Sequence, residues 1–111
     1  MVEDVLKDAI VKFNEKAKTD LKLAKEISGM TRVIQFEITD TGEFFHFVLE
    51  NQRAGELQKG QVEKPDIRVI CDANVVKQIS TGELRPMKAI ALRKIQVKAT
   101  LEDMLTLRKF F

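Results

Sequence analysis

The stretch PDIRVICDANVVKQISTGELRPMKAIALRKIQVK, residues 65–98, decides the fold. Its first part places Ile67, Val69 and Cys71 on one face of an extended chain, which predicts a half-buried strand. Asp72 follows, and its carboxylate can accept hydrogen bonds from the free N–H groups of a helical first turn. We therefore expect a strand followed directly by a short helix that Asp72 caps.

Glycine and proline divide the remainder of this stretch. Gly82 ends the first short helix, because glycine adopts the left-handed conformation without a Cβ clash. Pro86 begins a second short helix at its first turn, where a missing N–H costs nothing. The side of that helix that we expect to be buried consists of Met87, Ala89, Ile90 and Leu92. Alternation at period two returns at Ile95 and Val97 and predicts a final strand.

Two helices are predicted to precede the first strand. Apolar residues recur at spacings of three and four over residues 2–17, which is typical of an amphipathic helix. A break near Thr19, a suitable N-cap, predicts a second helix that Gly29 stops. Nothing at residues 18–20 forbids a single continuous helix, which is the alternative.

A hairpin and a third strand are predicted in the middle of the chain. Residues 31–39 and 43–50 alternate at period two around the turn at residues 40–42, where Gly42 supplies a positive φ. Residues 43–50 are apolar on both faces, which indicates a strand that is central or covered on both sides. Residues 54–59 are expected to form a third, polar strand.

The C-terminal end is predicted to be helical. Thr100 and Asp103 resemble a capping box in which aspartate replaces glutamate, and a helix over residues 101–109 follows. The side chains expected to be buried in it are Leu101, Met104 and Leu105, with Leu107 in the last turn as a further candidate. Phe110 and Phe111 either dock onto the core or form a lid or a contacting tip.

These elements predict one α+β domain over residues 1–111. We expect a five-stranded, mostly antiparallel, mixed sheet. N-terminal helices, two short helices and a C-terminal helix cover one of its faces.

The order of the motifs resembles the sterol carrier protein family, also called the sterol carrier protein type 2 domain. The motifs are DIRV at 66–69, GELRP at 82–86, AI at 89–90 and KIQV at 94–97. The chain departs from the family pattern at Arg93 and Ala99, where the family usually has glycine. The resemblance covers nearly the whole chain. It implies non-enzymatic binding, and transfer, of an apolar lipid such as a fatty acid, acyl chain, isoprenoid or sterol-like molecule in a cavity between sheet and helices.

Composition excludes several other classes of function. The chain has 111 residues, 44% of them hydrophobic and 32% charged, which is typical of a globular protein. We expect no signal peptide and a cytoplasmic location, because the first residues are acidic and no apolar segment follows them. One histidine, His46, and one cysteine, Cys71, cannot supply a closed set of metal ligands. We therefore expect no catalytic residue, metal or cofactor, and the sole candidate for catalysis is a Cys71–His46 pair.

A lipid pocket is the hypothesis that remains. The apolar side chains expected to line it are Ile34, Phe36, Phe45, Phe47, Ile79, Met87, Ile90, Met104, Leu105 and Phe110. The alternative is that these residues form a solid core. A dry void of about 300 Å³ would cost on the order of 7 kcal/mol, a large part of the stability of a domain. Either a lipid therefore occupies the gap, or the C-terminal helix collapses into it.

The C-terminal quarter of the chain is basic. Residues 85–111 carry seven basic and two acidic side chains, whereas residues 31–84 carry six basic and nine acidic ones. The side chains expected to meet a headgroup or an anionic membrane are Arg93, Lys94, Arg108 and Lys109. An ordinary solvated surface is the simpler interpretation. Nucleic acid is not expected as a partner, because no aromatic residue interleaves with these cations. The alternative function is a protein-interaction or accessory subunit with a solid core that docks an enzyme or a membrane through this basic C-terminal end.

Overall fold

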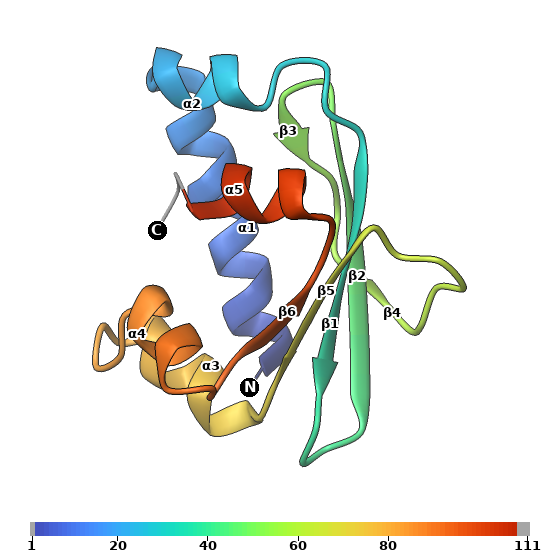
Figure 1. The fold of residues 1–111 in the computed structure, drawn as a ribbon, viewed down its shortest axis with the longest axis vertical. Helices are drawn as coiled ribbons and strands as arrows, with labels where there is room; N and C mark the ends of the chain where they lie inside the picture. The colour runs from blue at the N-terminus through green and yellow to red at the C-terminus, as the bar shows by residue number, and fades with distance from the viewer. Residues whose placement is uncertain (1, 109–111) are drawn as a thin grey trace.

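The computed structural model describes residues 2–108 of the chain, with side chains described up to Thr106. A mixed sheet packs with one face against a layer of helices, so the predicted α+β class is confirmed (Figure 1). In chain order the elements are α1 (Val2–Thr19), α2 (Leu21–Glu26), β1 (Arg32–Ile38), β2 (Glu43–Glu50), β3 (Arg53–Ala54), β4 (Gln58–Lys59), β5 (Ile67–Cys71), α3 (Ala73–Ser80), α4 (Pro86–Ala91), β6 (Gln96–Lys98) and α5 (Leu101–Arg108).

The break between the first two helices lies at Asp20. Its side chain accepts hydrogen bonds from the backbone N–H groups of Lys22 and Leu23, at 3.0 and 3.1 Å. Asp20 therefore caps α2, and the predicted cap at Thr19 is wrong by one residue, because Thr19 is the last residue of α1. The alternative of one continuous helix is also wrong, since the extended backbone of Asp20 interrupts it.

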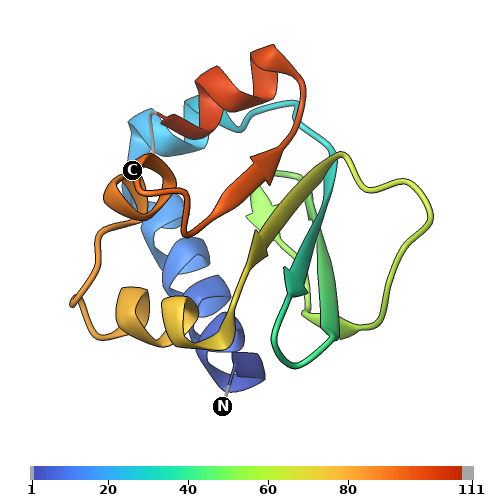
Figure 2. The same ribbon diagram turned by 60° about the horizontal axis from the view of Figure 1, so that its bottom comes forward.

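The sheet has the strand order β3-β2-β1-β5-β6, with β4 also paired to β2. β1 and β5 are parallel, and the remaining pairs are antiparallel. β2 is an interior strand, as its two apolar faces predict. The sheet turns one face to the helices, and a loop from β4 to β5 projects from the opposite face (Figures 1 and 2).

The predicted third strand is present as two short segments, β3 and β4, which both pair with β2. Three residues, 55–57, lie opposite two residues of β2 between the pairs Leu49–Ala54 and His46–Gln58. The extra residue is a β-bulge, which reverses the face on which later residues lie. As a result Leu57 is buried in the core. Gly55 lies at the bulge, where an added Cβ would be 3.1 Å from the carbonyl oxygen of Val48.

Local signals define the helical connection from β5 to β6 as predicted. Asp72 accepts a hydrogen bond from the N–H of Val75 at 2.8 Å and caps α3. Gly82 follows α3 with φ +80°, and Pro86 is the first residue of α4. Three signals read from the sequence therefore set the geometry of this segment.

The end of α4 has a left-handed residue that is not glycine. Arg93 has φ +60°. Its N–H bonds to the carbonyl of Ile90 at 3.0 Å, and the N–H of Lys94 bonds to the carbonyl of Ala89 at 2.8 Å. This pair of bonds is a Schellman motif, in which glycine is the favoured left-handed residue. The departure from the family pattern at Arg93 thus falls where the backbone most favours glycine.

The expected burial of α4 and α5 is partly wrong. In α4, Ala89 is buried, but Met87 is exposed, and Leu92 after it is exposed as well. In α5, Leu101 and Leu105 are exposed, with exposed fractions of 76% and 52%. Apolar spacing predicted the helices correctly but not the surfaces that would cover them.

Candidate functional site

The inner face of the sheet is buried at its two ends but not in its middle. At one end Ile38 and Phe45 are almost completely buried, and at the other Ile67 is. The two ends belong to two separate clusters of buried residues. Four half-buried side chains lie between the clusters and pack against both; they are Phe36, Phe47, Val69 and Val97, which we call the apolar belt.

The register shows that the belt is continuous across four strands. Phe36 of β1 lies opposite Val69 of β5, and Val69 lies opposite Val97 of β6. Directly paired residues project from the same face of a sheet. The ring of Phe47 in β2 stacks on that of Phe36 with centroids 6.0 Å apart and an interplanar angle of 24°. The belt is therefore one apolar strip that crosses the sheet beneath the helices.

The helices place further half-buried apolar side chains around the same interior. Ile79 of α3 and Ile90 of α4 pack against the first cluster, and Phe13 of α1 packs against the second. Met104 of α5 is also half-buried. Apolar side chains from the sheet and the helices thus retain access to water in the middle of the molecule, which is the kind of surface that a non-polar ligand covers.

An ion pair holds α5 to the sheet. Nε of Arg32, on β1, donates to both carboxylate oxygens of Asp103, at 3.1 and 2.9 Å. Asp103 is only 4% exposed, and its own N–H donates to the hydroxyl of Thr100 at 3.1 Å. The Asp103 carboxylate raises the pKa of the Arg32 guanidinium above its ordinary value. Thr100 caps the helix as predicted, but the carboxylate of Asp103 binds Arg32 instead of completing a capping box.

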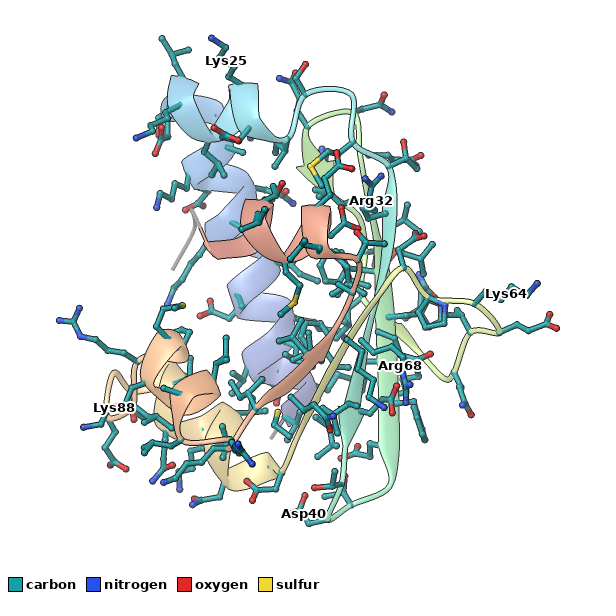
Figure 3. All side chains as sticks on the ribbon, viewed as in Figure 1. Lys25, Arg32, Asp40, Lys64, Arg68 and Lys88 are labelled. Atoms are coloured by element: carbon teal, nitrogen blue, oxygen red, sulfur yellow. The ribbon has the colours of Figure 1, made fainter. Side chains whose placement is uncertain are left out.

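This ion pair is the main described anchor of α5. Leu101 and Leu105 do not contribute burial, and Asp103 is the buried side chain among the described residues of the helix. In Figure 3, Arg32 lies at the end of the sheet next to α5. Among its side chains up to Thr106, α5 is therefore held mainly by polar contacts, with Met104 as the half-buried apolar one.

The structure places the predicted apolar lining residues in three environments. Ile34 and Phe45 are buried, Phe36, Phe47, Ile79, Ile90 and Met104 are half-buried, and Met87 and Leu105 are exposed. Phe110 and Lys109 lie outside the described residues, and for Arg108 only the backbone in α5 is described. That these residues line a ligand cavity remains a prediction.

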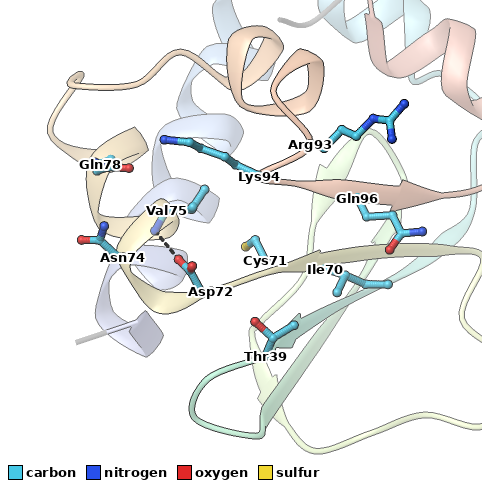
Figure 4. A pocket seen from close by; sticks show the side chains of 10 residues that line it. All are labelled: Thr39, Ile70, Cys71, Asp72, Asn74, Val75, Gln78, Arg93, Lys94 and Gln96. Carbon is cyan, nitrogen blue, oxygen red and sulfur yellow. Dashed lines mark hydrogen bonds between the residues drawn. The ribbon is translucent and has the colours of Figure 1, made fainter.

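Arg93 and Lys94 lie at the rim of a surface pocket of about 360 Å³. Its lining is mostly polar and comes from the start of α3 and the edge formed by β5 and β6: Thr39, Ile70, Cys71, Asp72, Asn74, Val75, Gln78, Arg93, Lys94 and Gln96. Figure 4 shows Lys94 extending toward α3, whereas Arg93 points the other way, above β6. A second pocket, of about 300 Å³, lies between the first two helices and the β2–β3 turn. The belt residues line neither pocket.

Cys71 and His46 do not form a catalytic pair. Cys71 lies on the inner face of β5, opposite Ile38, whereas His46 lies on the outer face of β2, opposite Gln35. Burial, with Asp72 and Asp40 nearby, raises the pKa of the Cys71 thiol to about 11. Nδ1 of His46 lies 2.9 Å from the carbonyl oxygen of Gly60, so it must carry the proton and donate it. The two side chains lie on opposite faces of the sheet and cannot act together.

The outer face of the sheet holds a closed polar network. The side-chain amide of Gln35 donates to Glu37 at 2.9 Å and accepts from the N–H of Val62 at 2.8 Å. Arg68, labelled in Figure 3, donates to Glu37 through two nitrogens, one of them at 2.8 Å. This pairing lowers the pKa of Glu37, chiefly through the hydrogen bond from Arg68. The network fixes the loop between β4 and β5 and leaves no buried side-chain polar atom without a partner among the described residues.

The described part of the chain offers no group of three or more His, Cys, Asp or Glu side chains that could hold a metal ion. Between residues 2 and 108, no helix is both long and apolar enough to span a bilayer. What the structure presents is apolar surface with a polar anchor at α5.

Sequence reasoning missed part of this site. The period-two alternation places Val69 and Val97 on apolar strand faces, but their partial burial is visible only in three dimensions. The Arg32–Asp103 pair joins residues 71 positions apart, and no local pattern pairs them. The one available signal is an aspartate in the first turn of a predicted helix, which also suits the helix dipole.

Comparisons with known proteins agree with this architecture. The sterol carrier protein 2 of Aedes aegypti, solved as a complex with the C16 fatty acid palmitate, is 22% identical, with a TM-score of 0.62 over 99% of this chain and 94% of that one. The palmitated SCP2L2 of the same species is 21% identical, with a TM-score of 0.63 over 91% of this chain and 88% of that one.

A longer protein contains the same fold. The inverting sec-alkylsulfatase Pisa1 from Pseudomonas sp. is 17% identical with a TM-score of 0.59, and the match covers 78% of this chain. The match spans only 13% of the sulfatase. These likenesses show the fold alone. No curated protein sequence shows significant similarity to the chain.

The sequence pattern of one family matches almost the whole chain. The model of the SCP-2 sterol transfer family covers residues 10–111. That span includes the sheet, the four motifs at residues 66–97, and the helices α3 and α4 that connect β5 to β6. The chain therefore belongs to the SCP-2 sterol transfer family.

Proposed function

We propose that the chain binds an apolar lipid with a single long acyl chain between the belt and the helices, and carries it through water without covalent chemistry. The observation that carries this proposal is the partial burial of Phe36, Phe47, Val69 and Val97 in the middle of the inner sheet face. Side chains in that position are completely buried in a solid core. The solved relative with bound palmitate supports an acyl chain as the ligand class.

The energetics favour an acyl chain. Each methylene transferred out of water contributes about 0.8 kcal/mol, so about a dozen methylenes supply a gross ~10 kcal/mol. Part of this is offset by the ordering of the chain on binding. The belt has no described polar side chain of its own, so the acyl part of a ligand would meet only apolar atoms there.

α5 is the element that would move to admit the ligand. Leu101 and Leu105 are exposed, and the described ion pair of α5 joins Arg32 and Asp103. Opening α5 therefore uncovers little apolar surface from these two leucines. The predicted headgroup contacts at Arg93 and Lys94 remain part of this proposal, because both are exposed and close to the α4–β6 end of the interior.

Filling the belt tests the proposal. Val69→Phe adds bulk on the inner face, and we expect it to weaken the binding of a fluorescent fatty acid at least tenfold. Val48→Phe is the matched control, because Val48 is equally half-buried but lies on the outer face, opposite Val33. Its affinity should match that of the unaltered protein. Circular dichroism checks that both variants fold. If Val69→Phe does not fold, the smaller change Val97→Leu replaces it in the binding assay.

Two results would count against the proposal. One is saturable binding that Val69→Phe and Val97→Leu leave unchanged, because the ligand would then lie elsewhere. The other is the absence of binding by the unaltered protein to fatty acids or other single-chain lipids, with palmitate as the first competitor.

A second function, docking onto a partner protein, is favoured by the exposed Leu101 and Leu105 of α5. In that case Leu101→Ser and Leu105→Ser would abolish capture of the partner and leave lipid binding intact. A lipid-loaded monomer, with no partner captured by the unaltered chain, would speak against it.

A further inference from the structure

The structure points to α4 and its flanks as a docking surface for anionic membranes, and we propose that the chain contacts such membranes through this surface. The surface consists of Arg85, Met87, Lys88, Leu92, Arg93 and Lys94, and we call it the α4 surface. All six residues are exposed. The inference does not require the proposed lipid binding, although membrane contact would bring a lipid carrier to the membrane that supplies its lipid.

The exposed side of α4 is apolar at its centre. Ala89 is completely buried and fixes the inward side of the helix. Met87 and Ala91 are four residues apart, so they share one face of the helix, and both are exposed. Leu92, directly after the helix, is 53% exposed. Met87, Ala91 and Leu92 are therefore available at the outward side of α4 to contact a non-aqueous partner.

Basic side chains flank this apolar centre. Residues 84–101 contain five basic side chains and no aspartate or glutamate. Within the part of the chain that the structure describes, Arg85, Lys88, Arg93 and Lys94 have no ion-pair partner. By contrast, Arg32 and Arg68 are both paired with carboxylates. Unpaired cations around apolar side chains are complementary to an anionic lipid surface.

The position of α4 makes the surface accessible. Figure 1 shows α4 on the side of the molecule opposite the sheet, and Figure 3 shows Lys88 pointing away from the rest of the protein. No described element covers the outward side of the helix. The inward side carries Ile90, which packs against the core next to the belt. A membrane that contacts α4 would therefore lie close to the helical side of the proposed ligand site.

Size favours a membrane over a protein as the partner. A helix of six residues is about 9 Å long and, with side chains, about 10 Å wide, so it offers roughly 100 Å². A stable protein interface buries about 800 Å² on each partner. A bilayer has no such minimum, because long flexible cations and a few inserted apolar side chains add their contributions independently.

Vesicle binding of the full chain tests the proposal. The probes are phosphatidylcholine vesicles with and without phosphatidylglycerol, and the partition coefficient is measured by co-sedimentation. We expect binding to the anionic vesicles that falls with added salt. Each cation near such a surface accounts for about a fivefold change, so Arg85→Gln with Lys88→Gln should weaken binding about 25-fold. Arg85 makes no capping hydrogen bond through its side chain, so this change does not remove a helix cap.

The control uses a second helix with the same features. α2 carries the exposed residues Leu21, Lys22 and Lys25, and Lys22→Gln with Lys25→Gln changes the net charge equally. Figure 1 shows α2 and α4 at opposite ends of the helical layer. The control should weaken binding by no more than a few-fold.

Three outcomes separate the possibilities. A 25-fold loss with the α4 variant and a small loss with the control support the α4 surface. Equal losses, or equal binding to neutral and anionic vesicles, would overturn it. Fatty-acid binding in solution, measured on the same variants, should not change. If the unaltered chain binds anionic vesicles, with the 25-fold loss confined to the α4 variant, but binds no fatty acid, the proposed function fails and the α4 surface stands.

Discussion

The attachment of α5 gives the sharpest prediction. In Asp103→Asn, the amide keeps the shape of the side chain but loses the charge that Arg32 pairs with. The hydroxyl of Thr100 still accepts from the backbone N–H of residue 103, so the helix cap stays in place. The variant therefore isolates the ion pair from the cap.

The magnitude follows from burial. Breaking a fully buried ion pair costs about 3–5 kcal/mol, and a hydrogen bond to a charged group contributes about 1.5–3 kcal/mol. The Asp103 side chain is 5% exposed, but that of Arg32 is 29% exposed and can be rehydrated. We therefore expect a loss of about 2 kcal/mol. Because Leu101 and Leu105 are exposed, the loss should appear as local opening of α5.

Hydrogen exchange measures this opening. A loss of about 2 kcal/mol corresponds to roughly 30-fold faster exchange of the α5 amides, with little change in β1 and β5. Glu102→Gln is the control, because Glu102 is adjacent, exposed and of the same charge. If Asp103→Asn changes exchange in α5 no more than Glu102→Gln does, the ion pair does not anchor the helix and the reasoning is refuted.

Three further predictions concern single positions. Arg93→Gly should raise the free energy of unfolding by about 1 kcal/mol and Tm by about 4 °C, because the backbone angle φ of +60° at Arg93 disfavours a side chain. Lys94→Gly is the control and should lower both quantities, because φ at Lys94 is not positive. A lowered Tm for Arg93→Gly would contradict the argument. In the folded protein the pKa of Glu37 lies below its ordinary value of 4.5, so the charged Glu37 stabilises the fold at pH values above 4.5, and this contribution is lost as the pH falls through the lowered pKa. Urea titrations should therefore show stability declining in acid, and Glu37→Gln should be less stable at neutral pH with a flatter dependence of stability on pH. An unchanged pH dependence would speak against the pair with Arg68. The pKa of Cys71, raised to about 11, predicts thiol alkylation in the native protein that is slow at pH 8 and becomes fast on unfolding, whereas fast native labelling would show that the strand opens.

Local chemistry explains which parts of the fold could be predicted. Asp72, Gly82 and Pro86 act through their own backbone or the next turn, so their residue types suffice. Thr19 and Asp20 are both suitable caps one position apart, and sequence alone does not choose between them. The bulge at residues 55–57 depends on the register against β2, which a single strand pattern does not contain.

The parts that could not be predicted depend on distant surfaces. Apolar spacing marked Met87 and Leu105 as buried, but burial requires a partner surface, and none covers them among the described residues. The belt residues look like ordinary core positions until their incomplete burial is seen. The ion pair of Arg32 could not be predicted either, because its partner, Asp103, lies 71 positions away in the sequence.

The central claim is that an acyl chain lies against the belt. Intermolecular nuclear Overhauser effects between ¹³C-labelled palmitate and the methyl groups of the protein test it most directly. The account predicts cross-peaks from the acyl chain to Val69 and Val97, and to the rings of Phe36 and Phe47. Bound palmitate whose cross-peaks avoid these four residues, and go instead to surface residues such as those around Arg93, would contradict it.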